Sequence, residues 1–176
     1  GGGDQRLYAW NEEGQLFDGY PLELCHPELC GEVGARIVSS AALGDIDGDG
    51  DLDAAIGTNE VPKGAAGLLY IVDLQEASIW AGYPLKRAGL VNQSILPVLG
   101  EGHVVSPALA DLDGDGDLEI ASAPMLGTAA PIQHDGTDMM ELDINLDRYG
   151  SEATFTDGSL IQMINNPAFA DLDGDG

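Results

Sequence analysis

Basic residues are scarce in this sequence of 176 residues. Six lysines and arginines face 31 aspartates and glutamates, so the formal net charge is −25. Because phosphate groups are bound by clustered cations, this balance argues against nucleic acid as a partner. It argues equally against docking on an anionic membrane surface.

Long apolar runs are also missing. No stretch approaches the roughly 18 residues of a membrane helix, so we expect no membrane insertion in this segment. The start, residues 1–4, has no initiator methionine and none of the basic or apolar regions of a signal peptide, and we expect a mature, processed or excised segment. Leucine, isoleucine, valine and phenylalanine make up about a quarter of the chain, which suffices to bury a core.

Cysteine and histidine are rare as well. Cys25 and Cys30 enclose four residues, which is the wrong spacing for a redox or haem-attachment motif. We favour a disulfide between them, consistent with an oxidising compartment, and two free thiols remain the alternative. His26, His103 and His134 have no cysteine or acid at metal-ligand spacing, so we expect loop or surface residues rather than catalytic bases.

The acidic residues, by contrast, are abundant and unevenly spread. Three short runs hold 13 of the 31, and each run reads Asp-x-Asp-Gly-Asp-Gly. We refer to residues 45–53 as loop 1, residues 111–119 as loop 2 and residues 171–176 as loop 3. Concentrating like charge costs repulsion, so a counter-charge is expected in these loops.

The loops are part of an internal repeat. Their first aspartates lie at 45, 111 and 171, at intervals of 66 and 60 residues. A second motif, Gly-Tyr-Pro-Leu, occurs at 19–22 and again at 82–85, in each case after an apolar stretch that contains tyrosine (6–11 and 68–73). Two independent motifs that share a period near 63 residues make chance similarity improbable.

Within one repeat the pattern predicts four short strands, at 41–43, 52–56, 68–72 and from 79 onward. Glycine and proline punctuate the joins, and no segment sustains a helical apolar period. Four antiparallel strands per roughly 60 residues fit a propeller blade. Residues 140–146 and 160–164 are further expected strands. The recurring aromatic residues are expected to pack in the core or between blades: Trp10, Tyr20, Trp80 and Tyr83.

The acidic loops predict cation sites. Carboxylates at loop positions 1, 3 and 5 can surround one hard cation, position 7 can add its backbone carbonyl, and position 9 a closing carboxylate. The expected ligands are Asp45, Asp47, Asp49, Asp51 and Asp53 in loop 1, Asp111, Asp113, Asp115, Asp117 and Glu119 in loop 2, and Asp171, Asp173 and Asp175 in the truncated loop 3. Oxygen ligands alone favour Ca²⁺ over Zn²⁺, and Mg²⁺ demands a stricter octahedron.

The acidic loops have two alternative interpretations. An EF-hand requires a glutamate at position 12 between two helices, whereas Ile56 and Ser122 stand there in strand-like stretches. The other alternative is a merely solvated acidic turn.

The motif Asp-x-Asp-Gly-Asp-Gly-x-x-Asp, preceded by a small-residue strand and repeated every ~60 residues, resembles the FG-GAP/VCBS repeats. The resemblance covers most of residues 1–123 and 166–176. It implies an integrin-α-like β-propeller with calcium between the first two strands of each blade. We therefore expect an all-β, partial propeller: the end of a blade at 1–36, a full blade at 37–103, a divergent blade at 104–165 and the start of another at 166–176.

The same resemblance implies a secreted, cell-surface or periplasmic module for adhesion, recognition or scaffolding, with a protein or glycan ligand. Calcium is then structural, and we expect no enzyme activity, since Ser39, Ser40 and Ser106 also lack a nucleophile elbow. Two alternatives stay open. One is the scaffold of a secreted polysaccharide-cleaving enzyme, and the other is a subunit of an extracellular assembly or filament that contacts neighbouring subunits.

Overall fold

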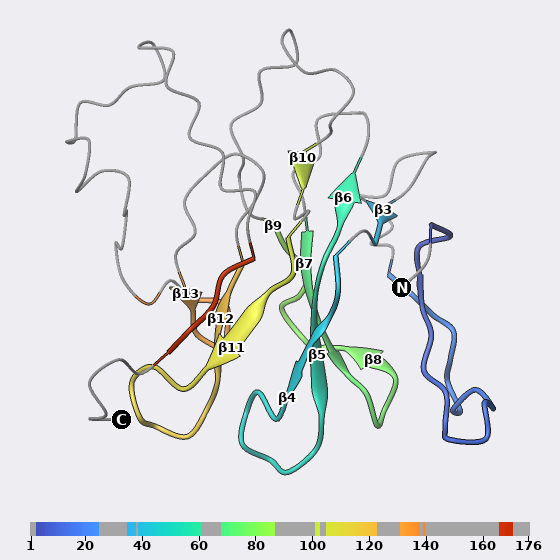
Figure 1. Cartoon of the computed structure of the whole chain (residues 1–176), viewed down its shortest axis with the longest axis horizontal. Helices are drawn as coiled ribbons and strands as arrows, with labels where there is room; N and C mark the ends of the chain where they lie inside the picture. The colour runs from blue at the N-terminus through green and yellow to red at the C-terminus, as the bar shows by residue number, and fades with distance from the viewer. Residues whose placement is uncertain are drawn as a thin grey trace, which may run out of the picture.

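The computed structural model describes residues 3–24, 35–37, 39–60, 68–86, 101–102, 105–122, 131–137, 139 and 166–170. Within these ranges every regular element is a β-strand and none is a helix, which confirms the all-β prediction. The strands pair antiparallel into four small sheets (Figure 1). The smaller elements are a hairpin of β1 (Arg6–Leu7) and β2 (Leu22–Glu23), and a sheet in the order β10 (Glu101–Gly102), β6 (Asn59–Glu60), β3 (Ala35–Arg36).

The central sheet contains the four strands that the repeat predicts. Its order is β4 (Ala42–Gly44), β5 (Asp53–Gly57), β7 (Leu68–Asp73) and β8 (Ser78–Ile79). The outer edge continues in β9 (Leu85–Lys86), which also pairs with β7. The fourth strand is therefore split in two around the Gly-Tyr-Pro turn, where proline lacks the N–H that a continuous ladder needs.

The next sheet repeats the first three strands of this plan, as β11 (Ala108–Ala110), β12 (Glu119–Ala121) and β13 (Pro131–Ile132). Loop 1 joins β4 to β5 and loop 2 joins β11 to β12, and both loops project from the same end of their sheets (Figure 1). The strands expected at 140–146 and 160–164 lie outside the described residues, as do Cys25, Cys30 and the three aspartates of loop 3.

The core is organised by β7, which is buried on both faces because it has a sheet on either side. Leu68, Tyr70 and Val72 contribute to one apolar cluster, and Leu69 and Ile71 contribute to another. The first cluster adds Leu7, Tyr20 and Leu24 of the N-terminal hairpin, and the second adds Ile46, Ile120 and Ile132 from loop 1 and the following sheet. Burial on both faces explains why β7 reads as a continuous apolar run.

One contact recurs between successive repeats. The Ser40 N–H donates to Ser106 Oγ at 3.0 Å, and the Ser106 N–H donates to Asn166 Oδ1 at 2.9 Å. Each of these residues lies five positions before the first aspartate of its loop, so the bonds join equivalent positions of three repeats.

The tyrosine of the Gly-Tyr-Pro motif makes a second recurring contact. Tyr20 Oη donates to the Leu74 carbonyl at 3.0 Å, and Tyr83 Oη donates to the His134 carbonyl at 2.8 Å. Both acceptors lie in the turn that follows the third strand of the next unit. These tyrosines therefore pack between units, as the sequence predicts.

Trp10 departs from the prediction. It is 56% exposed and stacks on Tyr8 with ring centroids 5.4 Å apart, whereas Val72, its counterpart in the next repeat, is fully buried. Val72 packs in the apolar cluster that includes Tyr20. Trp10 lies beyond β1, where its backbone forms an isolated bridge with Leu16 of the same hairpin, and among the described residues it belongs to neither apolar cluster.

Candidate metal centres

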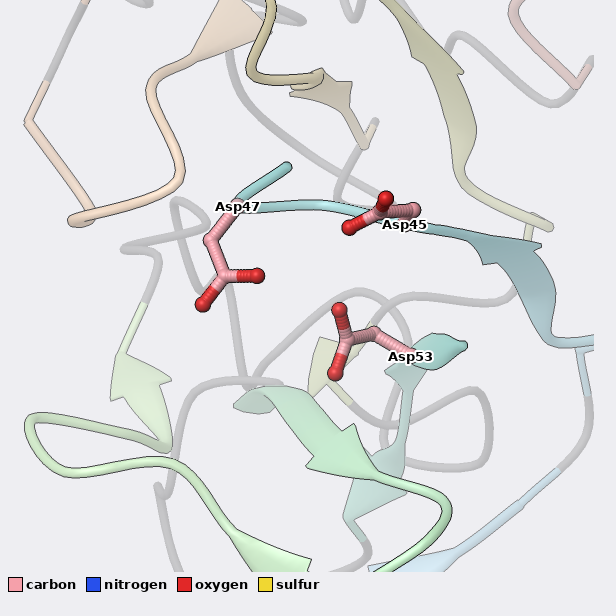
Figure 2. A group of neighbouring side chains, drawn as sticks. All are labelled: Asp45, Asp47 and Asp53. Atoms are coloured by element: carbon pink, nitrogen blue, oxygen red, sulfur yellow. The ribbon is translucent and has the colours of Figure 1, made fainter. Parts of the chain in front are cut away.

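Loop 1 gathers three carboxylates. Ligand oxygens of Asp45, Asp47 and Asp53 all lie within 4.8 Å of one another. Figure 2 shows the side chains of Asp45 and Asp47 directed toward a common space that Asp53 faces from the first residue of β5. The strand pairing produces this convergence, because Gly44 and Asp53 are register partners and the loop must return to its own starting point.

The backbone of loop 1 curls around its own carboxylates, which accept hydrogen bonds from N–H groups of the loop. The Gly50 N–H donates to Asp45 Oδ2, and the Ile46 N–H donates to Asp53 Oδ2, both at 3.0 Å. Gly48 and Gly50 have φ values of 72° and 98°, which a residue with a Cβ adopts only under strain. The glycines at positions 4 and 6 thus let the chain curl around the carboxylates.

The electrostatics of loop 1 favour a bound cation. Asp53 is only 3% exposed. Burial, together with the charges of Asp47, Asp73 and Asp49, raises its pKa from 3.8 to about 6 against the lowering effect of the Ile46 N–H. Asp45 Oδ1 is buried with no hydrogen-bond donor among the described residues. A cation between these carboxylates would neutralise them and satisfy that oxygen.

The backbone of loop 2 curls in the same way as that of loop 1, but a different set of carboxylates converges. Here Asp111, Asp113 and Asp115 converge within 4.8 Å, and all three are exposed. Asp111 Oδ2 accepts from the Gly116 N–H at 3.2 Å, as Asp45 does from Gly50. The closing Glu119 is 1% exposed, its Oε2 accepts from the Leu112 N–H at 2.6 Å, and burial raises its pKa.

The structure thus brings together six of the eight side chains expected as ligands in loops 1 and 2; position 7 is expected to contribute its backbone carbonyl. Asp49 and Asp115 at position 5 each accept a hydrogen bond from the residue two further on, at 2.9 and 3.0 Å. The donor sets consist of oxygen alone, which fits Ca²⁺ better than Zn²⁺. Two aspartate triads that could hold such an ion are therefore present.

Sequence reasoning missed two residues beside loop 2. His134 Nδ1 lies 3.1 Å from Asp117 Oδ2, and Gln133 Nε2 donates to Asp113 Oδ2 at 3.2 Å. Both belong to the turn after β13, which is equivalent to the turn after β7 in the repeat. That equivalence was the available signal, since the spacing along the chain is too long for a local motif.

Comparisons with known proteins add no identity: no family model, no curated protein and no solved structure matches the chain. Among the described residues, no helix combines the length and the apolarity needed to cross a membrane.

Proposed function

We propose that this chain is part of a β-propeller of the FG-GAP/VCBS type, in which calcium bound in the acidic loops holds successive sheets together. It acts as a binding or structural module that is secreted, surface-exposed or periplasmic, with protein or glycan as its ligand. Calcium has a structural and not a catalytic role. The observation that carries this proposal is the pair of carboxylate triads in equivalent loops of two repeats, one of them with a buried oxygen that has no hydrogen-bond donor in the described part of the chain.

The contacts between units support the radial arrangement. Bonds that join Ser40 to Ser106 and Ser106 to Asn166 repeat at the intervals of the loops themselves. The bonds from Tyr20 and Tyr83 repeat in the same sense, each to the turn of the next unit. A rotation that carries one unit onto the next produces such a series, as it does in a propeller.

The energetic role of calcium follows from mass action. A ligand that binds only the folded state stabilises it by about 2.7 kcal/mol when its concentration is about 100 times Kd. Two loops would contribute about 5 kcal/mol, which is comparable to the whole net stability of a domain. Such a protein belongs where calcium is plentiful, which is outside the cytosol.

Thermal unfolding with calcium and with chelator tests this function. Since about 1 kcal/mol shifts Tm by 2–4 °C in a chain of this size, chelation should lower Tm by roughly 10–20 °C. Asp18→Asn is the matched control, because it removes an exposed acid outside the loops and should keep the full calcium response. An unchanged Tm on chelation of the wild-type protein would contradict the structural role of calcium.

An exposed aromatic surface supports the recognition role. Tyr8 and Trp10 stack together, and Phe17 nearby along the hairpin is 53% exposed. Large exposed aromatic residues are typical of surfaces that bind other molecules. A glycan array probed with the wild-type protein and with Trp10→Ala checks this surface: loss of a specific signal in the variant is expected.

A further inference from the structure

Loops 1 and 2 touch each other directly. The Leu118 N–H of loop 2 donates to the Ile46 carbonyl of loop 1 at 2.8 Å. Gly48 lies against the same neighbour, since a Cβ added there would meet Asp117 Oδ1 at 3.3 Å. Gly44, just before loop 1, lies against the Leu118 side chain. The two candidate calcium sites are therefore adjacent parts of one interface between repeats.

The peptide groups of Ile46 connect the two sites. Its N–H donates to Asp53, the closing carboxylate of loop 1, and its carbonyl accepts from loop 2. Its side chain is fully buried in the same apolar cluster as Ile120, which directly follows Glu119. Ile46 thus cannot shift without disturbing both its own loop and its neighbour.

The connection continues into loop 2 through Leu118. This residue precedes Glu119, the closing carboxylate, which in turn holds the Leu112 N–H. A continuous path of hydrogen bonds and backbone therefore runs from the closing carboxylate of one loop to that of the other. When loop 1 is ordered, the Ile46 carbonyl is held in place, and so is the Leu118 N–H of loop 2 that donates to it. The same holds in the other direction.

We propose that calcium binding at loop 1 and at loop 2 is positively coupled through the bond between Ile46 and Leu118. This inference rests on the proposed function, because it takes both loops to be calcium sites. A cation that fixes Asp45 and Asp53 also fixes the Ile46 carbonyl, so that loop 2 has less conformational entropy to lose when it binds. Coupling is reciprocal, and each site raises the affinity of the other by the same factor.

Charge alone acts in the opposite direction, because a cation bound in loop 1 makes that loop less negative and so lowers the calcium affinity of loop 2. This electrostatic effect must be separated from the effect of ordering the backbone. Loop 1 carries five carboxylates, so bound Ca²⁺ changes its formal charge from −5 to −3. The variant Asp47→Asn/Asp49→Asn also has a formal charge of −3 in loop 1, but it lacks two of the expected calcium ligands, one of them a member of the triad. Comparing loop 2 in this variant with loop 2 in the calcium-filled wild type therefore holds the charge constant and changes only the order.

The two loops can be observed separately by NMR. The Gly50 amide donates to Asp45 in loop 1 and the Gly116 amide to Asp111 in loop 2, so each amide reports its own site. In a calcium titration of the whole chain, the midpoint for Gly116 should rise about 5-fold or more in Asp47→Asn/Asp49→Asn. The reciprocal variant, Asp113→Asn/Asp115→Asn, should raise the midpoint for Gly50 by a similar factor. In that variant, calcium in loop 1 alone should also slow hydrogen exchange of the Leu118 amide.

A backbone variant tests the bond itself. Leu118→Pro removes the N–H that donates to Ile46 and leaves every expected ligand side chain in place. Leu52→Pro is its control at the same position of loop 1, where the N–H makes no bond to another loop within the described part of the chain. With Leu118→Pro, the Gly116 midpoint should no longer depend on whether loop 1 binds calcium, whereas with Leu52→Pro the dependence should remain.

The outcomes separate the two proposals. Equal Gly116 midpoints in the wild type and in Asp47→Asn/Asp49→Asn, or a lower midpoint in the variant, would overturn the coupling while leaving calcium binding intact. If neither glycine amide responds to millimolar calcium in the wild type, the proposed function itself fails. The carboxylates replaced in these variants are exposed or partly exposed, so the fold should persist in both.

Discussion

Loop 1 and loop 2 are identical at seven of their nine positions, yet they bring different carboxylates together. In loop 1 the closing Asp53 joins Asp45 and Asp47, whereas in loop 2 Asp115 takes the third place and Glu119 stays apart. The loops differ at position 9, where the Glu119 side chain of loop 2 is one methylene longer than the Asp53 side chain of loop 1. The repeated motif thus dictates the backbone wrap, while the length of the closing side chain decides which oxygens converge.

Removal of the closing carboxylate should have the largest effect on calcium affinity. Asp53→Ala removes a member of the loop 1 triad and leaves the buried Ile46 N–H without its acceptor, so loop 1 affinity should fall at least about tenfold. Glu119→Ala should weaken loop 2 less, because its triad of Asp111, Asp113 and Asp115 remains. Calcium titration of the Gly50 and Gly116 amides measures both. An equal loss in the two loops would contradict the difference between them.

The second prediction concerns pH in the calcium-free protein. The pKa of Asp53 is about 6 in the folded state against an ordinary value of 3.8, so the folded form binds more protons between these values. Lowering the pH from 7.5 to 5, about one unit below the folded pKa, should therefore stabilise the chelated protein by about 1.4 kcal/mol from this residue. The raised pKa of Glu119 acts in the same direction.

Chelator melts across this pH range measure the effect, and Asp53→Asn should flatten the slope. With calcium present, protons compete with the cation and the trend should reverse. A chelated wild-type protein that loses stability on acidification to pH 5 would contradict the burial of a charged Asp53.

The third prediction uses glycines at position 4 of each loop. Gly48 and Gly114 have φ values of 72° and 78°, so alanine at either costs roughly 1–2 kcal/mol of backbone strain. Only Gly48 also lies against Asp117, whereas a Cβ on Gly114 meets nothing within 4 Å. Gly48→Ala should thus lower Tm more than Gly114→Ala in calcium, by a few degrees. Equal shifts would show that the contact between the loops carries no weight.

Some features of the loops and their surroundings could be predicted from the sequence, and others could not. The central strands and the loop ligands follow from local patterns, because burial on both faces gives β7 its apolar run and the wrap requires glycine at positions 4 and 6. The exposure of Trp10 could not be predicted, since it depends on which parts of the chain pack against the N-terminal hairpin. The contacts of Gln133 and His134 with loop 2 depend on packing between strands that are far apart in the chain.

The smallest predicted effect tests that last difference, because in the described residues this turn contacts the carboxylates of loop 2 and not those of loop 1. Gln133→Ala removes the donor to Asp113, and His134→Ala removes the neighbour of Asp117. Both pairs are partly exposed, so each variant should cost less than about 1 kcal/mol. The Gly116 midpoint should shift slightly while the Gly50 midpoint changes less. Gln75→Ala, in the equivalent turn after β7, is the matched control and should move neither midpoint. A larger shift at Gly50 than at Gly116 would mean that the turn after β13 acts on the sheet between the repeats and not on loop 2.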